Sequence, residues 1–324
     1  MGISLKNYLR PSVTNIVVTI GIAIVLWLKE LLIPTLPHVL NQTAIGELSD
    51  ATSIWLSLFA TLATGYLLFL LTEKFNFIQN RTYLPFFLYV IFSSTLPGFW
   101  IFSNGKIGFL LLLLSIWEIL STYHKTDPTK LVFNASMLLS LSILIVPEYI
   151  ILVLFLFISV FTINTLSSRI VHAIILGLAT PVILLGGIYY ATGSLQENTM
   201  QFVQGLTFRL PAWGNDNVYI IYHIVLFLLS LLAIRGCLMN RYQSNISERK
   251  NIHVMIWLFA FLSIIITLRM GQSSETSAAF TGIIAFLFAI FFSSNTSSKN
   301  TIFYFVLVMI FIIYNIIMSY GRIG

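Results

Sequence analysis

Long apolar stretches with few charges constrain the fold of this chain more than any other feature. A helix needs about 20 mainly apolar residues to cross the hydrocarbon core of a bilayer. Backbone in lipid must also satisfy its own hydrogen bonds, as helices do. We therefore predict an all-α fold, a polytopic transmembrane helical bundle of about 11 spans that forms one integral membrane domain over residues 1–324. The spans are expected near residues 13–33, 53–72, 83–102, 107–123, 131–146, 149–166, 170–191, 217–235, 253–270, 276–294 and 301–319.

Composition argues against a water-soluble domain and against several kinds of site. Hydrophobic residues make up 58% of the chain and charged residues 9%, whereas soluble domains average about 45–50% and about 25%. The single cysteine, Cys237, excludes an intrachain disulfide and a thiolate metal cluster. The five histidines show no ligand spacing, and zinc-protease, P-loop and dinucleotide-binding motifs are absent. The sequence therefore indicates no metal site and no particular cofactor.

Basic residues predict the orientation of the bundle. Lys and Arg accumulate in the cytoplasmic loops of membrane proteins. With a cytoplasmic N-terminus, twelve of the seventeen Lys and Arg residues fall on the inner side, and the opposite orientation reverses this count. The net charge of +6 is thus a topology signal rather than evidence for nucleic-acid binding. The first apolar stretch follows Lys6 and Arg10, and we expect it to be an uncleaved signal anchor.

Acidic residues show the opposite bias. In this orientation seven of the eleven acids fall outside: Glu30, Glu47, Asp50, Glu148, Glu197, Asp216 and Glu275. Acidic residues contribute little to membrane topology, so their bias indicates that the outer face has a functional role. The two longest outer segments are 34–52 and 192–216, and within the second we predict a short helix over 196–208 that lies on the membrane.

Two acids in the first outer segment, Glu47 and Asp50, allow two interpretations. Ser49 or Asp50 directly precedes an apolar run and suits the N-cap of a helix. Alternatively, Asp50 or Glu47 is a catalytic carboxylate, because poor solvation at a membrane surface favours proton uptake and suits a general base. The two roles are compatible with each other.

Two outer arginines, Arg209 and Arg269, lie next to apolar spans. A guanidinium group suits phosphate recognition, so they are candidates to bind a lipid-linked phosphate or diphosphate. The alternative is that both arginines form solvent-exposed ion pairs. Arg209 would then pair with Glu197 or Asp216, and Arg269 with Glu275.

Two further acids are ambiguous. Glu148 follows Pro147 at a tight outer turn, where its carboxylate could simply solvate the turn. Glu118 lies inside a predicted span, where ionisable groups are functional candidates, but it could also reach the inner interface.

One stretch carries a family resemblance. FNFIQNRTYLPFFLYVIFSSTLPG, from Phe75 to Gly98, resembles the entry into the third span of an uncharacterised family of multi-pass inner-membrane proteins of Bacteroidetes. Length and span pattern agree over most of the chain. The resemblance implies an integral protein of the bacterial inner (cytoplasmic) membrane and brings no established activity.

The architecture also resembles the GT-C glycosyltransferases, which use polyprenyl-phosphate-linked sugars and carry a catalytic acid in the first outer loop. That resemblance implies Asp50, or else Glu47, as the base or as the group that orients the acceptor. It implies Arg209 and Arg269 as phosphate ligands, with Glu148 and Glu275 as accessory substrate-binding groups. The chain departs from the pattern in its short first loop, in the lack of an adjacent Asp-Glu pair and in the lack of a soluble C-terminal domain.

Three function classes remain open. The first is a transferase on the extracytoplasmic face, for which a polyprenyl-phosphate lipid carrier would be the partner. The second is a small-molecule or lipid transporter, and the third is a non-catalytic membrane subunit of a cell-envelope assembly. Membrane lipid is a partner in every case, and protein partners are unknown.

Overall fold

The computed structural model describes most of the chain as helices. The described residues are 12–32, 42–43, 46–47, 49–78, 81–95, 99–163, 167–206, 217–239, 245–268, 275–294 and 298–320. The helices are α2 (Val13–Leu32), α3 (Asp50–Lys74), α4 (Leu84–Ser94), α5 (Asn104–Leu120), α6 (Thr129–Ile145), the 3-10 helix η2 (Pro147–Ile151), α7 (Leu152–Ile163), α8 (Ser168–Ala191), α9 (Leu195–Gly205), α10 (Asn217–Met239), α11 (Ile246–Leu268), α12 (Glu275–Ser294) and α13 (Ser298–Tyr320). Two short strands, β1 (Gln42–Thr43) and β2 (Gly46–Glu47), pair antiparallel within the first predicted outer segment.

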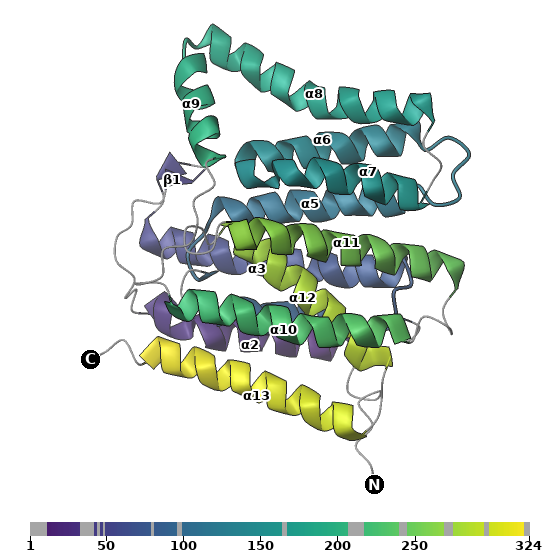
Figure 1. The fold of residues 1–324 in the computed structure, drawn as a ribbon. Helices are drawn as coiled ribbons and strands as arrows, with labels where there is room; N and C mark the ends of the chain where they lie inside the picture. The colour runs from purple at the N-terminus through teal and green to yellow at the C-terminus, as the bar shows by residue number, and fades with distance from the viewer. Residues whose placement is uncertain are drawn as a thin grey trace.

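Most of the helices lie side by side and run back and forth, so that their connections gather at two ends of the bundle (Figure 1). At one end lie β1, α9 and the starts of α3, α5 and α12, and we call this the β1 end. At the opposite end, α3 and α5 finish and α11 begins.

Helix length and composition make this an integral membrane protein. Among the described residues, six helices are long and apolar enough to cross a bilayer: 51–74, 168–191, 221–238, 246–268, 275–294 and 300–317. The predicted helical membrane architecture is therefore confirmed in this coarser form. Several other apolar helices are shorter, and α4 has only 11 residues. The count of about 11 crossings consequently remains a prediction.

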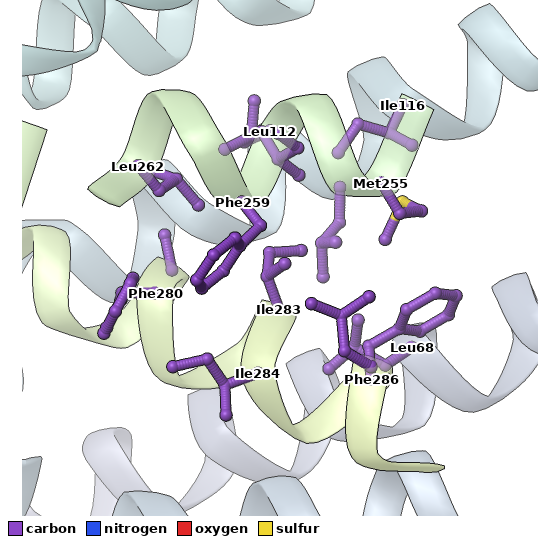
Figure 2. Packing of buried hydrophobic residues seen from close by; sticks show 14 of the residues in the cluster. Leu68, Leu112, Ile116, Met255, Phe259, Leu262, Phe280, Ile283, Ile284 and Phe286 are labelled. Carbon is purple, nitrogen blue, oxygen red and sulfur yellow. The ribbon is translucent and has the colours of Figure 1, made fainter. Parts of the chain in front are cut away.

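Helix α12 forms the centre of the bundle. In this apolar helix 89% of the spanning window is buried, compared with 28% in α8 and α13. An apolar helix in lipid needs no protein neighbours, so the burial of α12 reflects the helices that pack around it, chiefly α4, α5, α10 and α11. Figure 2 shows Phe259 of α11 beside Phe280 and Ile283 of α12, and the rings of Phe259 and Phe280 stack with their centres 5.7 Å apart.

A glycine in α12 permits one of these close contacts. A Cβ added at Gly282 would lie 2.3 Å from Cε1 of Phe109, a ring that is itself buried in the core. We expect Gly282→Ala to lower the free energy of unfolding by about 1–3 kcal/mol, because the packed rings must move. Thermal unfolding in detergent measures the change. Gly186→Ala in α8 is the matched control, since a Cβ at Gly186 meets nothing within 4 Å; equal losses in both variants would contradict the packing argument.

The start of α6 is held by a local hydrogen-bonding turn. Asp127 Oδ1 accepts hydrogen bonds from Thr129 Oγ1 at 2.5 Å and from Thr129 N at 3.1 Å. These bonds, the side-chain bond first, lower the pKa of the exposed Asp127 carboxyl below its ordinary 3.8. A carboxyl whose pKa is lowered by folding stabilises the folded protein at pH values above its ordinary pKa. This stabilisation is lost as the pH falls through the lower pKa of the folded protein.

Asp127→Asn should therefore lower the unfolding temperature slightly at neutral pH, and this difference should shrink as the pH falls below 3.8 and through the lower pKa of the folded protein. Unfolding temperatures measured across that range test the prediction. Glu197→Gln on exposed α9 is the control and should leave the curve unchanged. A loss in Asp127→Asn that persists unchanged in acid would argue against a role for the charge.

The predicted surface helix over 196–208 corresponds to α9, which is observed at Leu195–Gly205. Phe202 packs against the core of the bundle, whereas Met200 and Val203 are exposed. A Cβ at Gly205 would lie 2.9 Å from Cγ of Pro147, so the end of α9 rests on η2.

Candidate functional site

The first predicted acids, Glu47 and Asp50, are located by their backbone only. Ser49 is the N-cap of α3, and its Oγ accepts a hydrogen bond from Thr52 N at 3.5 Å. Asp50 is therefore the first helical residue rather than the cap. Glu47 lies in β2 opposite Gln42. The side chains of both acids lie outside the described part of the structure, so their catalytic role remains a prediction.

Arg209 and Arg269 also fall outside the described residues. The structure therefore tests neither their predicted binding of phosphate nor their alternative pairing with nearby acids.

Glu148 and Glu275 are brought to the same place. Glu148 is 2% exposed in η2, and Glu275 is half-buried at the start of α12. Both carboxylates lie close enough to interact electrostatically with Tyr149. The idea that Glu148 simply solvates an outer turn is therefore wrong, because helix packing removes this side chain from solvent. We call Glu148, Tyr149 and Glu275 the acid cluster.

The hydroxyl of Tyr149 distinguishes this cluster from ordinary packing. The side chain is fully buried, and its oxygen makes no hydrogen bond to any residue that the structure describes. A buried hydroxyl without a partner is costly. The group is thus available to a water molecule or to a substrate.

Two glycines of α5 allow the elements of the acid cluster to approach. A Cβ at Gly105 would lie 2.0 Å from the backbone oxygen of Glu275. A Cβ at Gly108 would lie 2.7 Å from Val146 Cγ2 and 3.3 Å from Tyr149 Cε2. The first turns of α5 therefore pack closely against both η2 and the start of α12.

Lys106, which the sequence analysis did not select, lies on the same turn of α5 and is 1% exposed. Its Nζ donates to Ser57 Oγ at 2.5 Å, to Phe99 O at 2.7 Å and to Thr61 Oγ1 at 2.9 Å. We call Lys106 and these three partners the lysine cluster. Within the described residues no carboxylate lies within 4.0 Å of this ammonium group. A buried cation is expensive, and here hydroxyl and carbonyl dipoles replace its water.

The hydroxyl groups of α3 follow a helical pattern that could have revealed the lysine cluster. Ser53, Ser57, Thr61 and Thr64 recur at spacings of three or four residues, so they line one face of the helix, and all four are buried. Ser53 Oγ accepts from Phe102 N at 3.0 Å, which fixes the segment before α5.

Tyr89 of α4 lies between the two clusters. Its hydroxyl hydrogen-bonds to Thr64, one turn beyond Thr61, and it also interacts electrostatically with Tyr149. Tyr89 therefore lies near Tyr149 of the acid cluster and also contacts the hydroxyl-lined face of α3.

Comparison with known proteins gives a family and no activity. Residues 31–320 match the model of a family described as a family of unknown function (DUF6427). Neither a curated protein nor a solved structure matches the chain. The predicted resemblance to an uncharacterised family is confirmed to that extent.

Proposed function

Since the chain belongs to this family of unknown function, we propose a function from its geometry: it is a membrane transferase that uses a polyprenyl-phosphate-linked donor. The observation that carries the proposal is the acid cluster. Two carboxylates from separate segments meet beside a buried tyrosine hydroxyl that has no hydrogen bond within the described structure.

The proposal places the β1 end on the extracytoplasmic face. The distribution of Lys and Arg supports this orientation, with a cytoplasmic N-terminus and about eleven crossings of the bacterial inner membrane. The architecture is GT-C-like in this view. It places the first outer segment, with Glu47 and Asp50, on the same side as the acid cluster.

The acid cluster has the groups that a glycosyl transfer requires. Glu275, the more exposed of the two acids, accepts the proton of the acceptor hydroxyl as that oxygen bonds to the anomeric carbon of the donor. The bond from this carbon to the phosphate oxygen breaks, and the lipid phosphate leaves with the electron pair. Tyr149 donates its hydroxyl proton in a hydrogen bond to that phosphate. Arg209 and Arg269 bind the phosphate charge, and Asp50 orients the acceptor.

The first test is a mass profile of lipid-linked and surface glycans in a strain that lacks the gene. If the protein is a transferase, a lipid-linked intermediate should accumulate in this strain and the wild-type gene should clear it. The Asp50→Asn and Glu148→Gln variants should fail to clear it although each variant protein reaches normal levels in the membrane. An unchanged profile in the deletion strain would rule out this activity.

The same variants separate the other two function classes. A transporter predicts that Glu118→Gln abolishes function while substitutions at the β1 end remain active. A non-catalytic subunit predicts a stoichiometric partner on purification and tolerance of all these substitutions.

A further inference from the structure

A second polar site lies at the opposite end of the bundle, away from the acid cluster. A pocket of about 490 Å³ forms where the ends of α3 and α5 meet the start of α11. A hydrogen bond from Asn251 Nδ2 to Phe75 O, at 3.4 Å, joins α11 to the end of α3 beside it. The distribution of basic residues predicts that this end faces the cytoplasm.

One side of the pocket is cationic. Lys74 and Lys125 both line it, and both side chains are exposed. Lys74 Nζ lies 4.0 Å from the ring centre of Trp117 and 3.4 Å from Ser121 Oγ, so its position is defined by a cation–π contact and a hydrogen bond. Two ammonium groups at the mouth of a pocket suit a phosphate group.

The lining of the pocket also includes two hydrogen-bond acceptors. Glu118 Oε2 and Asn251 Oδ1 are both buried, and neither has a hydrogen-bond partner among the described residues. The Asn251 side chain is 2% exposed. Buried acceptors are almost always satisfied, so these two indicate a donor that a ligand would supply.

The lysines themselves do not satisfy these acceptors. Within the described structure no ion pair joins Glu118 to a lysine or arginine at 4.0 Å or less. Lys74 instead contacts Trp117 and Ser121. The pocket is therefore lined by cationic groups and by a carboxylate that do not pair with each other, which suits a ligand that carries both charges.

We propose that this pocket binds the headgroup of an aminophospholipid, with the phosphate at Lys74 and Lys125 and the ammonium at Glu118 and Asn251. A phosphoethanolamine group carries one negative and one positive charge, and the pocket offers cationic side chains for the first and a carboxylate with an amide oxygen for the second. Trp117 and Tyr123 also line the pocket, and such aromatic residues favour the headgroup level of a bilayer. This site stands independently of the proposed transferase.

The experiment is native mass spectrometry of the full chain, released from detergent that contains phosphatidylethanolamine, phosphatidylglycerol or phosphatidylcholine with identical acyl chains. We expect one retained phosphatidylethanolamine per chain and weaker retention of the other two lipids. Glu118→Gln should lower phosphatidylethanolamine occupancy roughly tenfold, which is typical for loss of a charged hydrogen bond, and should remove the preference over phosphatidylglycerol. Lys74→Gln should weaken the retention of all three lipids.

The controls are chosen to keep the result interpretable. Lys130→Gln removes an exposed lysine that does not line the pocket and should change nothing. Soluble phosphoethanolamine should displace the lipid, whereas equal displacement by inorganic phosphate would overturn the ammonium assignment. If Glu118→Gln does not fold, the exposed pair Lys74→Gln and Lys125→Gln provides the test. Equal retention of the three lipids by the wild-type chain would overturn the proposal.

Discussion

Glu275→Gln is expected to reduce transfer by about a hundredfold or more while the protein accumulates normally in the membrane. General-base catalysis typically contributes about 10²–10⁴-fold, and glutamine preserves the shape of glutamate without its ability to take up a proton. Release of lipid phosphate from a radiolabelled lipid-linked donor in purified membranes is the measurement. Tyr149→Phe should give a smaller loss, because it removes one hydrogen bond from an otherwise intact cluster.

Glu73→Gln is the matched control for this experiment. Glu73 lies near the end of α3, at the opposite end of the bundle, where it pairs with Arg81 at 3.5 Å on the surface. Its replacement should leave the rate unchanged. Full activity in Glu275→Gln would remove Glu275 from the mechanism, and equal losses in both variants would point to a general effect on the bundle.

Lys106→Met is expected to lower the free energy of unfolding by about 1–3 kcal/mol, which is the usual cost of leaving buried polar groups without a hydrogen-bond partner. Methionine nearly fills the volume of lysine but leaves Ser57 Oγ and Thr61 Oγ1 without the lysine donor, whereas Phe99 O keeps its hydrogen bond from Ser57 Oγ at 2.8 Å. Reversible unfolding in mixed detergent micelles gives the value. The exposed Lys130→Met supplies the control and should be nearly neutral.

A double-mutant cycle isolates the hydrogen bond from other consequences of the substitution. Thr61→Val removes one acceptor, so the loss in the double variant should be smaller than the sum of the two single losses by about 0.5–3 kcal/mol. Strict additivity would mean that the contact at 2.9 Å contributes nothing measurable.

The apolar pattern predicted the helices well because each helix in lipid must be continuous and apolar. The run at 131–146 corresponds to α6 (Thr129–Ile145) and the run at 170–191 to α8 (Ser168–Ala191). The run at 83–102 was too long, since α4 ends at Ser94. Pro97 explains the difference, because proline disfavours helix at the residue before it and cannot continue the hydrogen-bonding pattern.

The site was harder to predict because it depends on contacts between distant segments. The sequence predicts an outer turn at Glu148, but the burial of this side chain arises because α9 and α11 pack against η2. The lysine cluster was missed because Lys106 was counted only as a topology signal. Its partners come from α3 and from the segment before α5, 45 and 7 residues away in sequence.

The place of α12 in the chain has a consequence for biosynthesis. The central helix of the bundle is the second to last to leave the ribosome, since only α13 follows it among the described helices. The surrounding helices α3, α4, α5, α10 and α11 must therefore enter the membrane before their common core exists. Until residues 275–294 are made, the side chains of these five helices that pack against α12 lack their packing partner. Any ribosome stall or truncation before Glu275 consequently yields an incomplete bundle that quality-control proteases can recognise.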